Sequence, residues 1–400
     1  MGNKKISSVQ FVDVYFPVID GVVRVVDNYA STFTKMGNEC RVVAPRMKGY
    51  TDKSIYEVLR VSSFRLPGFG YNIPAPNIKG RKIKRYLKEH KFDIYHLHSP
   101  FTVGKFAIKM ARKNKVPVVA HFHSKYYDDF LNITKSKVIS KLLVKIILRT
   151  YNKADAVWTV NESSANTLRE YGFKKEITVV PNGTEFVIPE NILELEEEVL
   201  KKYNLKKDEN LILYVGQLIW QKNLKLIFDT LKVLKDESFP FKMLVVGAGY
   251  NEKAIKKYAS NLGLDDMVFF LGGITNKEEL SAIYSVSDLF FFPSLYDTFS
   301  LVVREAAVLK TPSLLSKDSN ACEGITNNVD GFIEETDPKK MAFRIKEILK
   351  DKKTLIEIGE KAALNIPFRW NDVIKRAEKN YQEIINKYKK SKIKNKSKKS

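Results

Sequence analysis

The sequence predicts an α/β chain made of two domains, each organised around a parallel β-sheet. Its 400 residues exceed what one hydrophobic core usually organises. In both halves, short runs of β-branched and aromatic residues alternate with amphipathic helical stretches, which is typical of strand–helix–strand units. With 44% hydrophobic residues, the chain has enough apolar side chains to fill two cores.

Hydrophobic periodicity locates the expected elements along the chain. Strands are expected at residues 9–15, 39–44, 94–97, 116–121, 156–159 and 177–180 in the first half, and at 211–215, 242–246, 267–271, 289–292 and 313–315 in the second. Helices are expected at residues 22–36, 104–115, 135–152, 163–171, 224–234, 253–262, 277–285 and 339–351. Residues 181–184 predict a turn, and the acidic stretch 190–198 predicts a linker or an exposed helix.

These elements define the expected domain boundaries. We expect a first domain at residues 1–188, a second domain at 189–368 and a further helix at 369–386. Residues 387–400 contain eight lysines and little apolar material, so we expect a basic disordered tail.

Positive charge is concentrated in the first half of the chain and at its C-terminal end. Of the net charge of +22, residues 1–188 carry +17, residues 189–386 carry −3 and the last fourteen residues carry +8. This asymmetry indicates an anionic partner for the first half: nucleic acid, anionic lipid or an acidic substrate. A general enrichment in lysine does not explain the acidic second half.

Composition also argues against several classes of protein. No run of about 18 apolar residues is present, so we expect no transmembrane helix, and the first residues lack the apolar core of a signal peptide. Cys40 and Cys322 are too few for a disulfide framework or a cysteine metal site. We expect a cytoplasmic protein that is peripheral on the inner face of the plasma membrane.

Residues 290–312 combine an apolar strand, a turn-rich loop and a helix start. Asp297 lies in the loop before the helix expected at Leu301, and Glu305 lies about one turn inside that helix. The N–H groups and the dipole of a helix N-terminus suit a phosphate, while carboxylates accept hydrogen bonds from sugar hydroxyls. A glutamate on a helix is common, so Glu305 alone carries little weight. The combination predicts a sugar-nucleotide site.

Two pairs of histidines lie at the ends of expected strands in the first half. His96 and His98 belong to one strand end, and His121 and His123 to the next. Because side chains alternate faces, we expect His98 and His123 at the C-terminal edge of the sheet, where such sheets bind ligands. A His-x-His pair can also chelate zinc, but no third ligand with metal spacing accompanies these pairs, so zinc is the weaker interpretation.

Glycine turns follow three of the expected strands. Gly21 follows the first strand, Gly216 precedes Lys222, and Gly249 follows the strand at 242–246. Glycine lets a backbone approach a ligand closely, and a lysine at such a turn can neutralise a diphosphate. Each signal is weak alone, because most such glycines serve a turn and most lysines face solvent.

In this order, the motifs resemble those of the family 4 retaining glycosyltransferases of the GT-B fold, and particularly the bacterial diacylglycerol glucosyltransferase type. The resemblance covers residues 9–370, and its most specific part is the pair of carboxylates separated by seven residues, Asp297 and Glu305. Supporting matches lie at residues 17–21, 96–100, 121–124, 181–183, 216–222, 247–249, 293–294, 311–312, 323–324 and 331–332, and 368–381 resembles the closing segment of the family.

The resemblance implies two Rossmann-like domains that face each other across a cleft, an acceptor-binding domain at residues 1–188 and a nucleotide-sugar-binding domain at 189–368. It also implies that residues 369–386 form a crossover helix that packs on the N-terminal domain. It implies that Glu305 binds the ribose, Lys222 the diphosphate, and Asp297 the transferred sugar, with His123 beside the anomeric carbon. His123 and Asp297 are therefore the expected catalytic residues. The other expected donor-binding residues are Gly21, Gln217, Gly249, Phe299, Ser300 and Leu301. The implied reaction is front-face transfer with retention from a UDP-sugar, with no metal and no other cofactor, because positive charge at the diphosphate replaces the metal.

Two positions depart from the family pattern. Asp297 stands where the family has glutamate, so its side chain is one methylene shorter. Gln217 stands where the family usually has arginine, which removes one formal charge from the diphosphate site. We expect Lys222 to carry more of that role, or Lys225 or another residue to compensate.

The acceptor is suggested by residues 135–152, which combine leucine, isoleucine and valine with four expected membrane-contacting cations, Lys137, Lys141, Lys145 and Arg149. A basic amphipathic helix of this composition is typical of a membrane-surface anchor. The alternative is a helix whose apolar stripe packs on the sheet while its lysines face water, and both can hold at once. Residues 81–85 add a second basic cluster, and the loop at 67–71 could also contact a membrane interface.

We therefore expect a glycosyltransferase that acts on a membrane lipid such as diacylglycerol or a glycolipid, with His98 near the acceptor. A polyprenyl-linked or cell-surface glycan precursor is the alternative acceptor, and a nucleotide-sugar epimerase of the same fold is a more distant alternative. A nucleic-acid partner is not expected, because it would explain the charge but not the acidic pair, and no nucleic-acid module accompanies the basic clusters.

Overall fold

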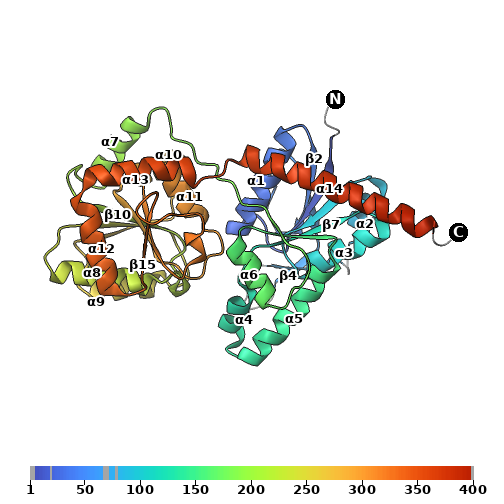
Figure 1. The fold of residues 1–400 in the computed structure, drawn as a ribbon, viewed down its shortest axis with the longest axis horizontal. Coiled ribbons are helices and arrows are strands. Elements are labelled where there is room, and N and C mark those ends of the chain that lie inside the picture. The colour runs from blue at the N-terminus through green and yellow to red at the C-terminus, as the bar shows by residue number, and fades with distance from the viewer. Residues whose placement is uncertain (1–4, 19, 66–71, 77–79, 398–400) are drawn as a thin grey trace. The chain divides into compact units, whose positions relative to one another are not determined.

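The computed structural model describes residues 5–18, 20–65, 72–76 and 80–397, which form two compact units (Figure 1). Unit 1 contains residues 1–183 together with 369–400, and unit 2 contains residues 184–368. The loop at 67–71 lies outside the described residues. The prediction of two parallel α/β sheets is confirmed.

Unit 1 is built on a parallel sheet in the order β3-β2-β1-β6-β7-β8-β9. Its strands are β1 (Ser7–Phe11), β2 (Glu39–Pro45), β3 (Glu57–Val61), β6 (Ile94–Leu97), β7 (Val118–Phe122), β8 (Ala156–Thr159) and β9 (Thr178–Val179), with an antiparallel pair β4 (Ser63–Arg65) and β5 (Asn72–Pro74) beside it. Its helices are α1 (Gly21–Lys35), α2 (Arg81–Glu89), α3 (Thr102–Asn114), α4 (Tyr126–Thr134), α5 (Lys137–Lys153), α6 (Glu162–Glu170) and α14 (Trp370–Ser397).

The last helix, α14, returns to unit 1 and packs beside α1 (Figure 1). Tyr381 of α14 is fully buried, and its ring stacks on Trp158 with centroids 5.2 Å apart. At the start of the helix, Trp370 lies against Gly183, where an added Cβ would meet the indole ring at 2.7 Å. The glycine of the 181–183 turn is therefore required by the packing of this helix.

The prediction that residues 387–400 form a disordered tail is wrong as far as Ser397, because α14 continues to that residue. Lysine has a good intrinsic helix propensity, and no glycine or proline interrupts the segment. A helix already anchored by Tyr381 therefore extends into solvent at little cost.

Unit 2 has the same architecture, with a parallel sheet in the order β12-β11-β10-β13-β14-β15. Its strands are β10 (Leu211–Val215), β11 (Lys242–Val246), β12 (Val268–Gly272), β13 (Leu289–Phe292), β14 (Ser313–Ser316) and β15 (Phe332–Glu334). Its helices are α7 (Ile192–Lys202), α8 (Leu224–Asp236), α9 (Glu252–Asn261), α10 (Lys277–Val286), α11 (Leu301–Val308), α12 (Pro338–Lys350) and α13 (Lys352–Asn365), with short 3₁₀ turns η1 (Trp220–Lys222) and η2 (Asn320–Cys322).

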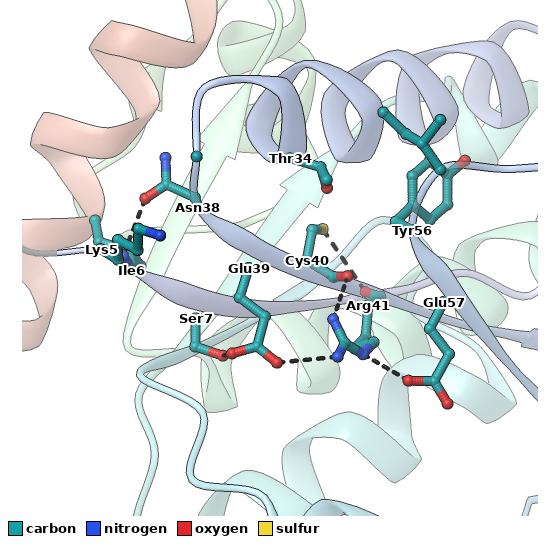
Figure 2. Close-up of a pocket in the computed structure, with 12 residues that line it drawn as sticks. Lys5, Ile6, Ser7, Thr34, Asn38, Glu39, Cys40, Arg41, Tyr56 and Glu57 are labelled. Carbon is teal, nitrogen blue, oxygen red and sulfur yellow. Dashed lines mark hydrogen bonds and ion pairs between the residues drawn. The ribbon is translucent and has the colours of Figure 1, made fainter.

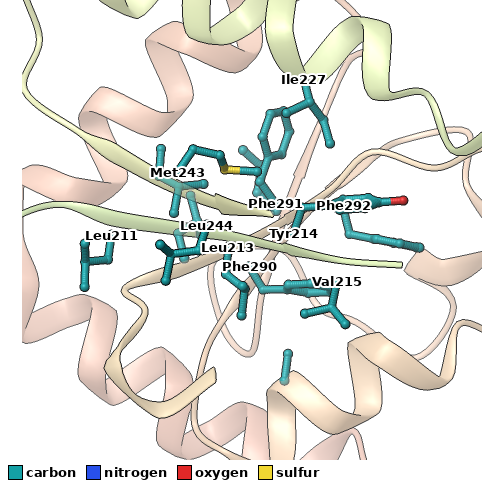
Figure 3. Close-up of a cluster of buried hydrophobic side chains, with 14 of the residues drawn as sticks. Leu211, Leu213, Tyr214, Val215, Ile227, Met243, Leu244, Phe290, Phe291 and Phe292 are labelled. Atoms are coloured by element: carbon teal, nitrogen blue, oxygen red, sulfur yellow. The ribbon is translucent and has the colours of Figure 1, made fainter. Parts of the chain in front are cut away.

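The core of unit 2 explains why its strands read as continuous apolar runs. Phe290, Phe291 and Phe292 of β13 are buried on both faces of the sheet and pack among side chains from β10, β11 and α8 (Figure 3). A parallel sheet covered by helices on both faces has no solvent side, so its strands need no polar alternation. The acidic stretch expected as a linker or exposed helix is helix α7.

Among the described residues, no helix combines the length and apolar character needed to cross a bilayer. The elements that periodicity did not predict include the edge strands β3 and β15, the short pair β4 and β5, and the helices α2, α4 and α13. Their burial comes from long-range partners, which a local pattern does not contain. The basic cluster at residues 81–85 belongs to α2.

Candidate functional site

The candidate site of unit 2 lies at the C-terminal ends of β10, β11 and β13. The strand order reverses between β10 and β13, because β11 and β12 lie on one side and β14 and β15 on the other. Loops after such neighbouring strands diverge and leave a crevice, which is where open α/β sheets bind ligands. The residues predicted from sequence in this half, Lys222, Asp297 and Gly249, follow these three strands.

Lys222 and Asp297 form an ion pair at this edge. The distance between Lys222 Nζ and Asp297 Oδ1 is 2.6 Å, and only 12% and 15% of the two side chains is exposed. Ser294 Oγ donates a hydrogen bond to the other carboxylate oxygen at 2.5 Å. The two residues expected to hold different parts of one substrate therefore hold each other in this structure.

The helix that follows Asp297 begins with an unusual backbone. Ser300, the residue before α11, has φ 55° in the left-handed region, and no side chain caps the helix. Its buried hydroxyl has no hydrogen-bond partner. Asn223 before α8 is also left-handed, at φ 61°. Strained conformations of this kind cluster at ligand sites, and here they flank Lys222 and the N-terminus of α11.

Arg304 holds the loop in place. The guanidinium is buried, donates to the carbonyls of Phe299 at 2.6 Å and Glu323 at 3.1 Å, and lies 4.3 Å from the centroid of the Phe299 ring. Burial lowers the pKa of Arg304 to about 10, which leaves it charged at neutral pH. Sequence reasoning missed this residue, although an arginine inside a helix that otherwise carries only apolar side chains and Glu305 was a signal for it.

Glu305 is buried on the first turn and a half of α11. Tyr284 Oη, from α10, donates to Glu305 Oε2 at 3.2 Å. Leu301 is the first residue of the same helix, and Phe299 is buried just before it. The expected ribose-binding carboxylate thus has a fixed position on a rigid element.

The glycines after β10 and β11 pack loop against loop. An added Cβ at Gly249 would meet the carbonyl oxygen of Leu218 at 2.4 Å, and one at Gly247, with φ +145°, would meet that of Gly216 at 1.8 Å. These glycines are therefore required by the protein itself. Gln217 is exposed, and its carbonyl accepts a hydrogen bond from Tyr214 Oη at 3.0 Å.

In unit 1, the predicted residues follow β1, β6 and β7, again on both sides of a reversal in strand order. His98 Nδ1 and His123 Nε2 are 3.0 Å apart, so these two are brought together as expected. Gly21 begins α1, and an added Cβ there would meet no described atom within 4 Å. Within the part of unit 1 that the structure describes, no neighbouring atom requires glycine at that position.

The four strand-end histidines form one buried array. Burial lowers the pKa of His123 to about 3, and burial together with neighbouring imidazoles lowers the pKa values of His96, His98 and His121 well below the usual range. All four rings are therefore neutral at physiological pH.

The array brings together a third histidine, which sequence spacing did not supply. Ligand atoms of His96, His98 and His121 lie within 4.8 Å of one another, so the reason given above against zinc does not hold in the structure. However, both ring nitrogens of His98 are bonded to protein groups. The rings of His96 and His121 are also nearly parallel, at 9°, with centroids 5.4 Å apart. This geometry favours packed neutral imidazoles over nitrogens that converge on an ion.

A separate pocket of about 490 Å³ opens at the N-terminal ends of β1, β2 and β3 (Figure 2). It lies at the edge of the sheet opposite to the one that carries His98 and His123. Its central cation, Arg41, is paired with Glu39 at 3.1 Å and Glu57 at 2.7 Å. These carboxylates satisfy the guanidinium internally, so the pocket is not a candidate for the predicted anionic substrate.

Helix α5 shows both features that its sequence allowed. Val144, Ile147 and Leu148 are buried against unit 1, which is the core-packing interpretation. The outward side nevertheless exposes apolar side chains among cations. We call the exposed residues Ile133, Lys137, Val138, Ile139, Lys141, Leu142 and Lys145 the α5 patch. Arg149 is also exposed, one turn further along α5.

Comparisons with known proteins give these observations a context. The model "Glycosyltransferase Family 4" matches residues 19–186, and the model "Glycosyl transferases group 1" matches residues 196–364. The α-monoglucosyldiacylglycerol synthase of Streptococcus pneumoniae is 27% identical over 307 residues, which cover 76% of this chain and 69% of the relative.

An Escherichia coli relative, UDP-Gal:α-D-GlcNAc-diphosphoundecaprenol α-1,3-galactosyltransferase, is 27% identical over 397 residues. The match covers 94% of this chain and 95% of the relative. Among solved structures, Anabaena HepE in complex with UDP superimposes with a TM-score of 0.76 at 16% identity, covering 94% of this chain and all of the other. Two family models that together span both units, on two parallel α/β sheets of this order, place the chain among the family 4 glycosyltransferases of the GT-B fold.

Proposed function

We propose that this glycosyltransferase moves a hexose, glucose in the first instance, from a UDP-sugar to a membrane lipid such as diacylglycerol or a glycolipid. The main observation in support of a UDP-sugar donor is that Lys222, Asp297 and the N-terminus of α11 meet where the strand order of unit 2 reverses. A cation beside an uncapped helix N-terminus matches a diphosphate, and nearby carboxylates match sugar hydroxyls. The solved relative that contains UDP is consistent with this donor.

In the proposed complex, the diphosphate takes the ammonium of Lys222 and the N–H groups at the start of α11. Asp297 is then released to accept hydrogen bonds from the transferred sugar, and Glu305 accepts them from the ribose. Gln217 and Gly249 lie on the neighbouring loops, and the backbone of Phe299, Ser300 and Leu301 lines the sugar. The shorter Asp297 thus acts as the partner that Lys222 exchanges for the diphosphate.

The proposed reaction retains the configuration of the anomeric carbon and needs no metal. The bond from the anomeric carbon to the phosphate oxygen breaks, and UDP leaves with the bonding electrons. The acceptor hydroxyl adds to the same face, and its proton passes to the departing phosphate oxygen. Lys222 and the dipole of α11 stabilise the charge that develops on the leaving group. Gly21 and His123 are the residues of unit 1 that we propose take part in the reaction.

The lipid acceptor is supported by the α5 patch. Val138, Ile139 and Leu142 are 78%, 48% and 57% exposed between lysines that attract anionic headgroups. Near an anionic leaflet each cation contributes about 1 kcal/mol, and the apolar side chains add insertion energy. We therefore propose a peripheral location on the cytoplasmic leaflet. A relative that makes α-monoglucosyldiacylglycerol supports a diacylglycerol-based acceptor.

A polyprenyl-linked saccharide is a second candidate acceptor. The E. coli relative with a diphosphoundecaprenol acceptor matches nearly the whole chain, at the same identity as the diacylglycerol relative. The α5 patch suits either acceptor, because both are presented at a membrane surface.

The test is UDP release from a panel of UDP-hexoses, measured with anionic vesicles that contain diacylglycerol, a glucosyl-diacylglycerol or a polyprenyl diphosphate saccharide. Transfer to a diacylglycerol-based lipid supports the proposal, and transfer only to the polyprenyl acceptor replaces it with the second candidate. Tight UDP binding without turnover of any donor would exclude an active transferase. Sedimentation with neither anionic nor neutral vesicles would exclude the membrane location.

A further inference from the structure

A chain of hydrogen bonds runs through the interior of unit 1 and includes His123. Ser8 Oγ donates to Cys40 Sγ at 3.6 Å, and Gln10 Nε2 donates to Ser8 Oγ at 3.2 Å. Gln10 Oε1 lies 2.9 Å from His98 Nε2, and His98 Nδ1 lies 3.0 Å from His123 Nε2. All of these side chains are buried, with Ser8 and Gln10 fully inaccessible.

The chemistry of each group gives this chain one direction. With its amide nitrogen directed to Ser8, Gln10 offers His98 only a carbonyl oxygen, which can accept but not donate. His98 therefore carries its proton on Nε2, and because the ring is neutral, Nδ1 has only a lone pair. That lone pair must accept from His123 Nε2, so a neutral His123 carries its proton on Nε2 and a lone pair on Nδ1.

We propose that Gln10 and His98 are positioning residues that hold His123 in its Nε2–H tautomer, so that His123 meets substrate as a hydrogen-bond acceptor and not as a donor. The part that concerns substrate rests on the proposed function. An Nδ1 acceptor can orient a sugar or acceptor hydroxyl. It has no proton for the leaving phosphate, which leaves that proton to come from the acceptor hydroxyl. A reversed Gln10 amide would reverse every bond in the chain, so the tautomer reports directly on the arrangement.

The first experiment measures the tautomer in the intact protein, which has only five histidines, one of them the exposed His90. Two-bond proton–nitrogen correlation spectra of protein labelled with ¹⁵N-histidine distinguish protonated from unprotonated ring nitrogens. Protons on Nε2 of both His98 and His123 support the inference, and a proton on Nδ1 of His123 overturns it. The tautomer is measured without any turnover. A failure of the proposed function would therefore not be mistaken for a failure of the inference about the hydrogen-bond chain.

The second experiment uses Gln10→Met, which keeps an unbranched side chain of similar size but removes the carbonyl. Its matched control is Tyr95→Phe on β6, which removes a buried hydroxyl that accepts a hydrogen bond from Asn114 at 2.9 Å. This hydroxyl is not part of the hydrogen-bond chain that includes His123. Gln10→Met should mix the tautomers of His123 and lower kcat/KM about tenfold, the equivalent of one hydrogen bond in the transition state. Tyr95→Phe should leave both unchanged. A native tautomer in folded Gln10→Met overturns the positioning role.

Discussion

Replacing Asp297 by asparagine should strengthen the binding of UDP while it weakens transfer of the sugar. The reason is the 2.6 Å ion pair between Lys222 and Asp297, which a diphosphate has to break before it can use the ammonium. A hydrogen bond to a charged group contributes about 1.5–3 kcal/mol, and an ion pair adds charge–charge attraction to it. Asparagine keeps the shape and still accepts a hydrogen bond from the Lys222 ammonium but removes that attraction, so about 1–1.5 kcal/mol becomes available, and the dissociation constant of UDP should fall about five- to tenfold.

The measurement is calorimetric titration of UDP into the wild type and the variant, together with UDP release from UDP-glucose. Asp236→Asn is the matched control, because Asp236 pairs with Lys232 on an exposed part of α8 and neither residue is expected to bind the donor. Lys222→Met should weaken UDP binding, and most of the gain from Asp297→Asn should vanish in that background. UDP affinity that is unchanged or lower in Asp297→Asn would refute the exchange of partners, as would an equal gain in Asp236→Asn.

Three further predictions concern other parts of the molecule. Glu305→Gln should weaken UDP binding about tenfold but leave inorganic pyrophosphate unaffected, because only UDP has a ribose; an equal loss for both ligands contradicts the ribose role. The free energy of unfolding should fall as the pH drops from about 6.5 towards 3, by up to about 1.4 kcal/mol per pH unit for each buried histidine. The reason is that the histidines become protonated in the unfolded chain but stay neutral in the folded one. Asp13, whose pKa burial raises to about 6, opposes part of this fall between about pH 6 and 4, and a flat profile in urea unfolding contradicts the neutral array. Val138→Asp should reduce sedimentation with anionic vesicles, whereas Leu364→Asp, at an 83% exposed site on α13, should not; equal sedimentation of both variants argues against the α5 patch.

Local patterns in the sequence predicted most of the fold and the region of the site. The strand β13, the loop after it and the start of α11 could all be predicted from the sequence, because each depends on the propensity and periodicity of a few neighbouring residues. The edge strands β3 and β15, the helix α13 and the extension of α14 were not predicted, since their stability comes from partners far away in the chain or from a helix already anchored elsewhere.

Within the sites, sequence alone determined which side chains follow the strands: Lys222, Asp297 and Glu305 in one unit, His98 and His123 in the other. Tertiary structure decided what those side chains do to one another. It brought Lys222 and Asp297 into an ion pair across 75 positions of sequence, placed Arg304 beneath the loop, and joined Gln10 to His123 through His98. The physical reason is that a side chain's charge state and hydrogen-bond direction depend on burial and on partners from other strands, and a sequence does not specify these until the sheet order is known.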